Sequence, residues 1–199
     1  MVKFIFDLDG TVTSVETLPI IAKHYGIEKH IESLTMKTVS GNIPFIESFI
    51  NRVHLMATLP VDGINDLLEE TTVYPHIQNF INEHKNDCII ATGNLDCWVE
   101  KLCRKVGCKA FTSKAIVKDN EVFKLTNILR KETIVREYQN QGYTVVVIGE
   151  GNNDLEAMRA ADISIASGLT HKPANSVLGI VDYVIYEEEA LCRQLNQLL

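Results

Sequence analysis

The sequence predicts an α/β fold in which a Rossmann-like parallel sheet carries a small helical cap inserted after its first strand. Three short runs are apolar throughout rather than alternating, at Val2–Phe6, Cys88–Ala91 and Thr144–Ile148. Runs of this kind are typical of parallel strands that are covered on both faces. Helical patterns separate the runs, and this alternation of strands with helices favours the same fold class.

The remaining elements of the core follow in order along the chain. Weaker strand patterns lie at Asp162–Ala166 and Tyr183–Ile185. Helices are expected around the strands, at His76–His84, Cys97–Val106, Glu132–Gln141, Leu155–Ala161 and Glu188–Leu198. Because ligands bind beyond the carboxyl ends of the strands in such sheets, the polar residues that follow each strand are the candidates for function.

The stretch from residue 14 to residue 70 contains helical patterns and no convincing strand. Its expected helices are Leu18–Tyr25, Ile31–Val39, Ile43–Met56 and Val61–Glu69. We therefore expect residues 1–13 and 71–199 to form the core domain and residues 14–70 to form a cap over the crevice. A chain of 199 residues suits one domain with such an insert.

Composition and charge exclude several classes of function. The formal net charge is −7 and no basic cluster is present, which argues against binding of nucleic acid or of an anionic membrane. No apolar stretch approaches the ~20 residues that cross a bilayer, and no signal-peptide pattern precedes the first strand. The five cysteines form no CxxC pair, so we expect reduced thiols in a soluble cytoplasmic protein. No pattern indicates the oligomeric state.

Two carboxylates follow the first strand. Asp7 and Asp9 are two residues apart, so on an extended strand their side chains would point the same way. Such a pair suits phosphoryl transfer, in which one carboxylate attacks phosphorus while the other donates a proton to the leaving oxygen and later activates water. Gly10 would let the chain turn tightly beside a substrate. The alternative is a solvated acidic turn, because turns favour Asp and Gly.

Polar residues at the other two strand ends would complete a phosphate site. Thr92 and Gly93 offer a hydroxyl and backbone N–H groups for phosphate oxygens, although Thr-Gly after a strand is usually a simple turn. Lys131 opens an expected helix and would neutralise a nucleophile and a phosphoryl group, unless it is a surface lysine. Glu150 and Asp154 suit Mg²⁺, which prefers carboxylates and water; alternatively, Asp154 is a helix N-cap.

In this order, the residues resemble the four motifs of the haloacid dehalogenase superfamily: a DxD nucleophile loop, a Ser or Thr, a Lys and an acidic GDxxxD-type loop. The resemblance spans nearly the whole chain. It implies that Asp7 is the nucleophile, that Asp9 is the general acid and base, and that Lys131 assists catalysis. It further implies phosphate binding by Thr92, Gly93, Lys131 and Asn153. Mg²⁺ would be held by Asp7, Asp9 through its carbonyl, Glu150 and Asp154.

The insert resembles the cap of phosphoserine phosphatases. In that family an early Glu, a Phe and an Arg of the cap recognise the amino acid end of the substrate, and they map onto Glu16, Phe45 and Arg52. The chemistry agrees, because Arg52 can pair with a carboxylate through two hydrogen bonds and Glu16 can accept from an ammonium group. Phe45 would exclude water. The alternatives are cap core for Phe45, stabilisation of a helix start for Glu16, and a surface position for Arg52.

The chain departs from the family pattern at three places. The usual Ser-Gly-Gly is Thr92-Gly93-Asn94, Gly10 stands where DxDST has Ser, and Glu150 replaces the metal-loop aspartate. The extra methylene of Glu150 matters because Mg²⁺ tolerates little distortion of its octahedral geometry. Either the loop shifts, or metal binding weakens, or Asp154 supplies the ligand while Glu150 supports it.

The leading hypothesis is a Mg²⁺-dependent phosphatase that acts through an aspartyl-phosphate on phosphoserine or a similar small phosphorylated metabolite. One alternative is a phosphatase or phosphotransferase for another metabolite. The other is a non-catalytic binding or regulatory protein on a degenerate scaffold, which the Glu150 departure suggests. The retained carboxylates favour catalysis, since a cluster of like charges is unfavourable without a ligand.

Overall fold

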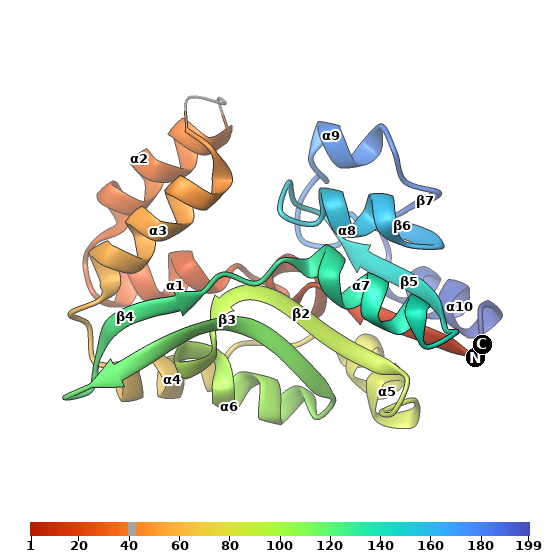
Figure 1. Cartoon of the computed structure of the whole chain (residues 1–199), viewed down its shortest axis with the longest axis horizontal. Coiled ribbons are helices and arrows are strands. Elements are labelled where there is room, and N and C mark those ends of the chain that lie inside the picture. The colour runs from red at the N-terminus through yellow and green to blue at the C-terminus, as the bar shows by residue number, and fades with distance from the viewer. Residues whose placement is uncertain (40–42) are drawn as a thin grey trace.

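A computed structural model describes residues 1–39 and 43–199, leaving the side chains of residues 35–39 and 45 outside the description (Figure 1). Within the described residues, seven strands form one sheet in the order β4-β3-β2-β1-β5-β6-β7. Neighbouring strands are parallel except for the antiparallel pair β3 and β4. The predicted α/β fold with a parallel sheet is confirmed.

Outside the helices between β1 and β2 and the consecutive strands β3 and β4, the described strands alternate with helices as expected. The strands are β1 (Val2–Phe6), β2 (Cys88–Leu95), β3 (Lys109–Lys118), β4 (Glu121–Asn127), β5 (Thr144–Gly149), β6 (Ile163–Ser167) and β7 (Tyr183–Ile185). A tight irregular turn, η1 (Leu8–Val12), follows β1. The first helices are α1 (Thr17–His24), α2 (Glu28–Val39), α3 (Phe45–Met56), α4 (Val61–Glu69) and α5 (Pro75–Glu83). The later helices are α6 (Asp96–Val106), α7 (Lys131–Asn140), α8 (Leu155–Ala160), α9 (Asn175–Leu178) and α10 (Glu188–Gln197).

Strand β1 lies at the centre of the sheet because it pairs with β2 on one side and β5 on the other. Its side chains alternate between two apolar layers. Phe4 and Phe6 pack with residues of α5, α6 and α10, whereas Ile5 packs with residues of α7, α8 and α9. Burial on both faces explains why the runs that predict β1, β2 and β5 are apolar throughout.

The hairpin of β3 and β4 was not predicted. Both strands are partly exposed, so neither contains a continuous apolar run. Their connection is Asp119-Asn120, and both residues have positive φ, at 52° and 63°. This conformation is that of a two-residue hairpin turn, for which Asp and Asn are favoured residues. The Asn120 carbonyl accepts a hydrogen bond from Val61 N at 2.8 Å, so the hairpin contacts the start of α4.

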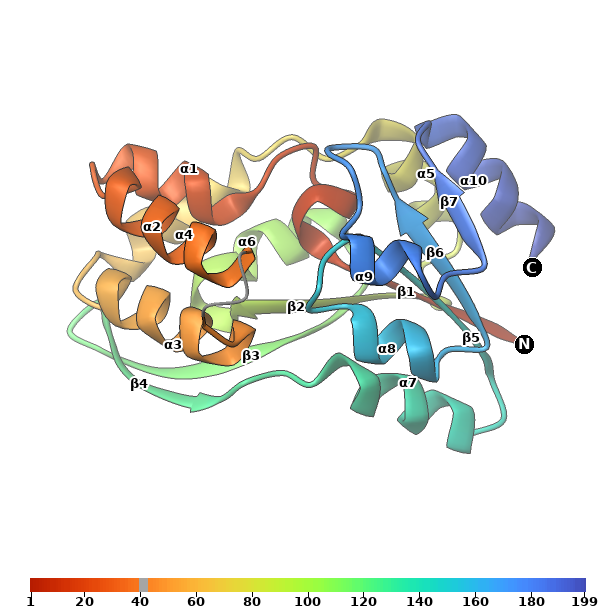
Figure 2. The same cartoon turned by 90° about the horizontal axis from the view of Figure 1, so that it is seen from above.

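The helices α1 to α4 come between β1 and β2, as expected for an insert. Figure 2 shows α2 and α3 at the end of the molecule opposite the two termini. Helix α4 packs against the core helix α6, where Asn65 Oδ1 accepts from Lys101 N at 2.9 Å. The expected boundary between cap and core at residue 70 stays a prediction. In the described part of the chain, no helix is long and apolar enough to cross a membrane.

Candidate active site

The polar residues that follow β1, β2 and β5 meet at the carboxyl edge of the sheet. Asp7 N donates to Ile148 O at 2.8 Å, which fixes the end of β1 beside the end of β5. A cleft with a volume of about 100 Å³ opens there. It is lined by residues of the strand ends and of the insert: Asp7, Asp9, Glu16, Leu18, Phe49, Arg52, Thr92, Gly93, Asn94, Glu150 and Asn153.

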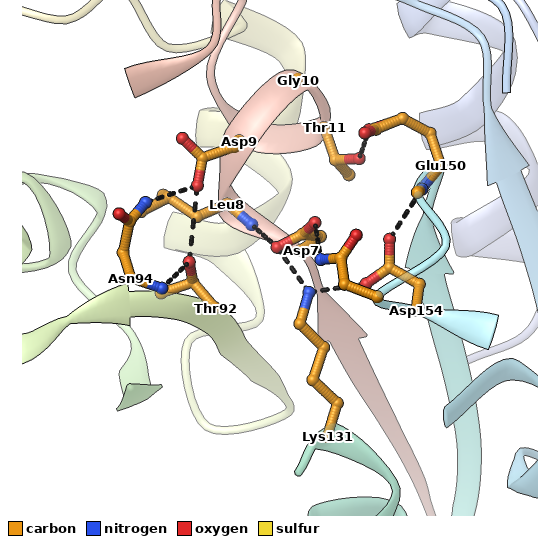
Figure 3. Close-up of polar contacts among 12 residues, drawn as sticks. Asp7, Leu8, Asp9, Gly10, Thr11, Thr92, Asn94, Lys131, Glu150 and Asp154 are labelled. Carbon is orange, nitrogen blue, oxygen red and sulfur yellow. Dashed lines mark hydrogen bonds and ion pairs between the residues drawn. The ribbon is translucent and has the colours of Figure 1, made fainter. Parts of the chain in front are cut away.

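Lys131 lies between two buried carboxylates (Figure 3). Its Nζ is 2.7 Å from Asp7 Oδ1 and 2.5 Å from Asp154 Oδ1. The lysine and Asp7 side chains are each 5% exposed and that of Asp154 is 1% exposed, so the surface-lysine alternative is wrong. Leu8 N also donates to Asp7 Oδ1 at 2.8 Å, and Asn153 Nδ2 donates to Asp7 Oδ2 at 3.3 Å.

Burial and neighbouring charge act together on this cluster. Burial lowers the pKa of Lys131, but the carboxylates of Asp154 and Asp7 outweigh it and raise that pKa above its usual value. Burial raises the pKa of Asp7 well above its usual range, Asp154 and Glu150 add to the shift, and Lys131 opposes it. A further cation near Asp7 would therefore favour the ionised form that a nucleophile needs.

The turn η1 sets the direction of Asp9. The chain leaves the strand at Leu8, and Gly10 has a φ of 68°. This backbone conformation favours glycine, and a Cβ on Gly10 would lie 2.8 Å from Glu16 Oε1 and 3.1 Å from Glu150 Oε2, so the ends of these two side chains would have to shift. Figure 3 shows Asp7 facing Lys131 and Asp9 facing another side of the site. The expectation that an extended strand aligns the two carboxylates is wrong, although both line the cleft.

Four donors hold the Asp9 carboxylate. Its Oδ1 accepts from Thr17 N at 2.9 Å and from the Thr17 hydroxyl. Its Oδ2 accepts from Asn94 Nδ2 at 2.7 Å and from Thr92 Oγ1 at 3.4 Å. Asn94 Nδ2 also donates to Thr17 Oγ1 at 2.9 Å. Gly93 lies beside this network with open space over its Cα, which leaves room for a ligand.

The two acids of the loop after β5 have different surroundings. Asp154 Oδ2 accepts from Glu150 N at 3.0 Å and from Gly151 N at 2.9 Å, while its Oδ1 faces Lys131. Asp154 stands at the N-cap position of α8, but its side chain makes no capping hydrogen bond there. Glu150 lines the cleft. Asp154 therefore organises the loop, and Glu150 is the acid of this loop that is open to a ligand.

The Glu150 carboxylate contacts two other segments. Thr11 Oγ1 donates to Glu150 Oε2 at 3.2 Å. His171 Nε2 lies 3.4 Å from Glu150 Oε1 and 3.5 Å from Glu16 Oε1. The hydrogen bond to Glu150 raises the pKa of His171, against burial and with the help of both carboxylate charges.

Two of the three residues expected to recognise a substrate line the cleft. Glu16 precedes α1 and Arg52 lies on α3. Burial, together with the charges of Asp9 and Glu150, raises the pKa of Glu16 to about 7. Burial lowers the pKa of Arg52, and Glu16 opposes the shift. The side chain of Phe45 lies outside the described residues, while Phe49, one turn further along α3, lines the cleft.

Sequence reasoning missed the roles of Thr17, Asn94 and His171. The only hints were adjacency, since Thr17 follows Glu16 and Asn94 follows Gly93. A single histidine in a loop carries no comparable signal. His171 is nevertheless part of a group with Glu16 and Glu150 whose ligand atoms lie within 4.8 Å of one another.

The donors around the cleft fit a divalent cation. The carboxylates of Asp7, Asp9, Glu16 and Glu150 all line it, whereas Arg52 is the single cationic side chain among the described lining residues. Lys131 neutralises part of the charge from below. Carboxylate oxygens are the ligands that Mg²⁺ prefers, and a cation there would relieve the repulsion among these groups.

Comparison with known proteins defines the class. The sequence model described as haloacid dehalogenase-like hydrolase matches residues 4–162, and the chain belongs to this family. The phosphoserine phosphatase of Methanocaldococcus jannaschii is 28% identical over 178 residues, which are 81% of this chain and 83% of the relative. That of Saccharomyces cerevisiae is 27% identical over 180 residues, which are 82% of this chain and 58% of the relative.

Solved structures agree on the fold. A phospho-aspartyl intermediate analogue of a phosphoserine phosphatase superposes with a TM-score of 0.81 at 24% identity, covering 98% of this chain and 97% of that one. A HAD family hydrolase of Salmonella enterica serovar Typhi has a TM-score of 0.84 at 23% identity, covering 96% of this chain and 70% of that one. Within the family, the protein is a phosphoserine phosphatase-like phosphoric monoester hydrolase.

Proposed function

We propose that this hydrolase is Mg²⁺-dependent, forms an aspartyl-phosphate on Asp7, and acts on phosphoserine or a similar small phosphorylated metabolite. The observation that carries the proposal is the buried cluster of Asp7, Lys131 and Asp154 at the base of a cleft that Asp9 also lines. Desolvated charges of this kind cost free energy, and they recur at sites where chemistry uses them.

In the first half of the proposed reaction, an Asp7 oxygen attacks phosphorus. The bond from phosphorus to the ester oxygen breaks, and its electron pair leaves with that oxygen, which takes a proton from Asp9. Lys131 compensates negative charge beside Asp7, while Thr92, Gly93 and Asn153 would bind phosphate oxygens. Mg²⁺, held by Asp7, the Asp9 carbonyl and Glu150, would neutralise charge on the phosphoryl group.

In the second half, water attacks the phosphorus of the aspartyl-phosphate. Asp9 takes a proton from that water, the bond from phosphorus to the Asp7 oxygen breaks, and inorganic phosphate leaves. Thr17 and Asn94 suit this role of Asp9 because they fix its carboxylate at the cleft. Asp154 acts indirectly in this scheme, since its oxygens hold Lys131 and the backbone of the loop at residues 150–154, which we call the metal loop.

The insert supports the choice of substrate. Arg52 would pair with a substrate carboxylate and Glu16 with an ammonium group, at the same cleft as the phosphate site. A cleft of about 100 Å³ suits a small substrate, and the two relatives compared above are phosphoserine phosphatases. We further propose that residues 14–70 cap the cleft and that Phe45 contributes to it. A cytoplasmic location also remains a prediction.

The test is phosphate release from L-phosphoserine and from a panel of phosphorylated metabolites, with Mg²⁺ or with EDTA. Release should require Mg²⁺ and disappear in Asp7→Asn, and acid-quenched wild type should carry a phosphoryl group on the peptide that contains Asp7. Asp66→Asn is the matched control, because that side chain is 63% exposed and lies outside the site. Undiminished release by Asp7→Asn would refute the mechanism.

The same panel tests the substrate. Activity on other esters without phosphoserine hydrolysis would keep the mechanism and refute the substrate assignment. Transfer of the phosphoryl group to an added alcohol, in place of water, would identify a phosphotransferase.

A further inference from the structure

Glu150 carries a longer side chain than the aspartate of the family pattern, and its carboxylate is held from two sides. Thr11, in the turn after β1, donates to one oxygen. His171, in the loop after β6, lies 3.4 Å from the other oxygen. The two contacts come from segments that are distant in the sequence, and together they limit where this long side chain can swing.

The position of His171 is set by the loop that carries it. Ala174 N, three residues later, donates to the backbone oxygen of Glu150 at 2.9 Å. Ser176, on α9 at the end of this loop, donates to Asn152 Oδ1 of the metal loop. Thr170 bonds to Tyr74 with 3.1 Å between their hydroxyl oxygens. The loop after β6 is thus fastened directly to the metal loop, so His171 meets Glu150 through fixed backbone geometry.

The imidazole also separates two carboxylates. His171 Nε2 lies 3.5 Å from Glu16, on the insert side of the cleft, and contacts Glu150 on the sheet side. Without His171, Glu150 would keep the single contact with Thr11 among those described above and would face Glu16 directly. The carboxylates of Glu150 and Glu16 would then repel one another, and Glu150 would no longer be held in one position.

We propose that His171 is a positioning residue for the metal loop. It holds the Glu150 carboxylate in place, so that this longer side chain can bind the metal at the position where the family pattern has aspartate. The inference rests on the Mg²⁺ site of the proposed function. Groups that orient a metal ligand without touching the metal typically change affinity about 10–100-fold. An aspartate at position 150 would be too short to make the same contact, so His171 should matter little in that background.

The test is Mg²⁺ binding by isothermal titration calorimetry to wild type, His171→Ala, Glu150→Asp and the double variant. We expect His171→Ala to weaken binding about 10-fold or more in wild type. In the Glu150→Asp background, the same change should alter binding less than about 2-fold, since the coupling of neighbouring residues is lost with their contact. His171→Gln keeps an N–H donor and should retain most of the affinity. Lys172→Ala removes an adjacent, exposed cation and should bind Mg²⁺ as wild type does.

Three outcomes would overturn the inference. Equal weakening in both backgrounds would mean that His171 acts on the site without Glu150. Unchanged Mg²⁺ affinity in His171→Ala, with loss of Zn²⁺ or Co²⁺ binding, would make the imidazole a direct ligand of another cation. If wild type binds no Mg²⁺, the metal part of the proposed function is refuted. If wild type binds Mg²⁺ tightly and His171→Ala binds it equally well, only the role of His171 is refuted.

Discussion

Replacement of Lys131 by Met tests the electrostatics of the site most directly. Methionine approximates the length of the lysine stem but carries no charge. The change leaves the carboxylates of Asp7 and Asp154 facing one another without the ammonium group that lies within 2.7 Å of both. Because these side chains are 5% and 1% exposed, water replaces little of the lost interaction.

The magnitude follows from that burial. Removing one partner of a buried ion pair costs about 3–5 kcal/mol, since an uncompensated charge remains. In a chain of this size 1 kcal/mol changes Tm by about 2–4 °C, so Lys131→Met should lower Tm by about 6–20 °C. The loss should shrink at acid pH. Folding raises the pKa of Asp7, so this carboxyl destabilises the folded state increasingly as the pH rises above about 3.9, the pKa of an aspartate in the unfolded chain. At lower pH the carboxyl is protonated in both states and this penalty disappears.

The assay is thermal and urea denaturation of the metal-free protein at pH 7, repeated at pH 5. Lys101→Met is the control, because Lys101 pairs with exposed Asp66 and its removal should leave the midpoint essentially unchanged. Adding Asp154→Asn to Lys131→Met should recover part of the loss by removing one of the two facing charges. A loss below about 1 kcal/mol, the range of exposed pairs, or a double variant no more stable than the single one, would refute the reasoning.

Three further predictions concern the cleft. Asn94→Ala should lower kcat about 10–100-fold with little change in KM, because it frees the Asp9 carboxylate from a 2.7 Å hydrogen bond; equal kcat would show that Thr17 suffices. Arg52→Ala should raise KM for L-phosphoserine about 10–100-fold, the value of a charged hydrogen bond, and spare p-nitrophenyl phosphate, which lacks a carboxylate. Gly10→Ala should destabilise more than Gly26→Ala in urea denaturation: both glycines have a φ of 68°, but only the first would meet neighbouring atoms. Equal losses would show that backbone conformation alone requires Gly10.

The sheet was predictable because burial on both faces is expressed in local composition. The strands β1, β2 and β5 are buried along most of their length, and their sequences are accordingly apolar. Strands β3 and β4 lie at one edge of the sheet and are partly exposed. Their sequences mix polar and apolar residues, so they contain no apolar run that would predict a strand. The Asp119-Asn120 turn was the available signal, since few other residue pairs adopt positive φ in succession.

The site was predictable in its residues but not in their partners. Strand ends fix which side chains converge, whereas the donor that each acid accepts from depends on turns and on distant loops. The turn after β1 directs Asp9 towards Asn94, 85 positions away in the sequence, which donates a hydrogen bond to it. Glu150 contacts His171, which comes from another loop.

The choice between the two acids of the metal loop shows how such partners decide a role. From sequence, Asp154 was as good a metal ligand as Glu150. In the structure, Lys131 and two backbone N–H groups occupy the oxygens of Asp154, and releasing them would leave buried donors unsatisfied at a cost of about 1–3 kcal/mol each. Glu150 lines the cleft, and its partners among the contacts described above are the Thr11 hydroxyl and His171 rather than Lys131 and the backbone of the loop. Metal binding should therefore depend on Glu150 directly and on Asp154 through the loop that it holds together.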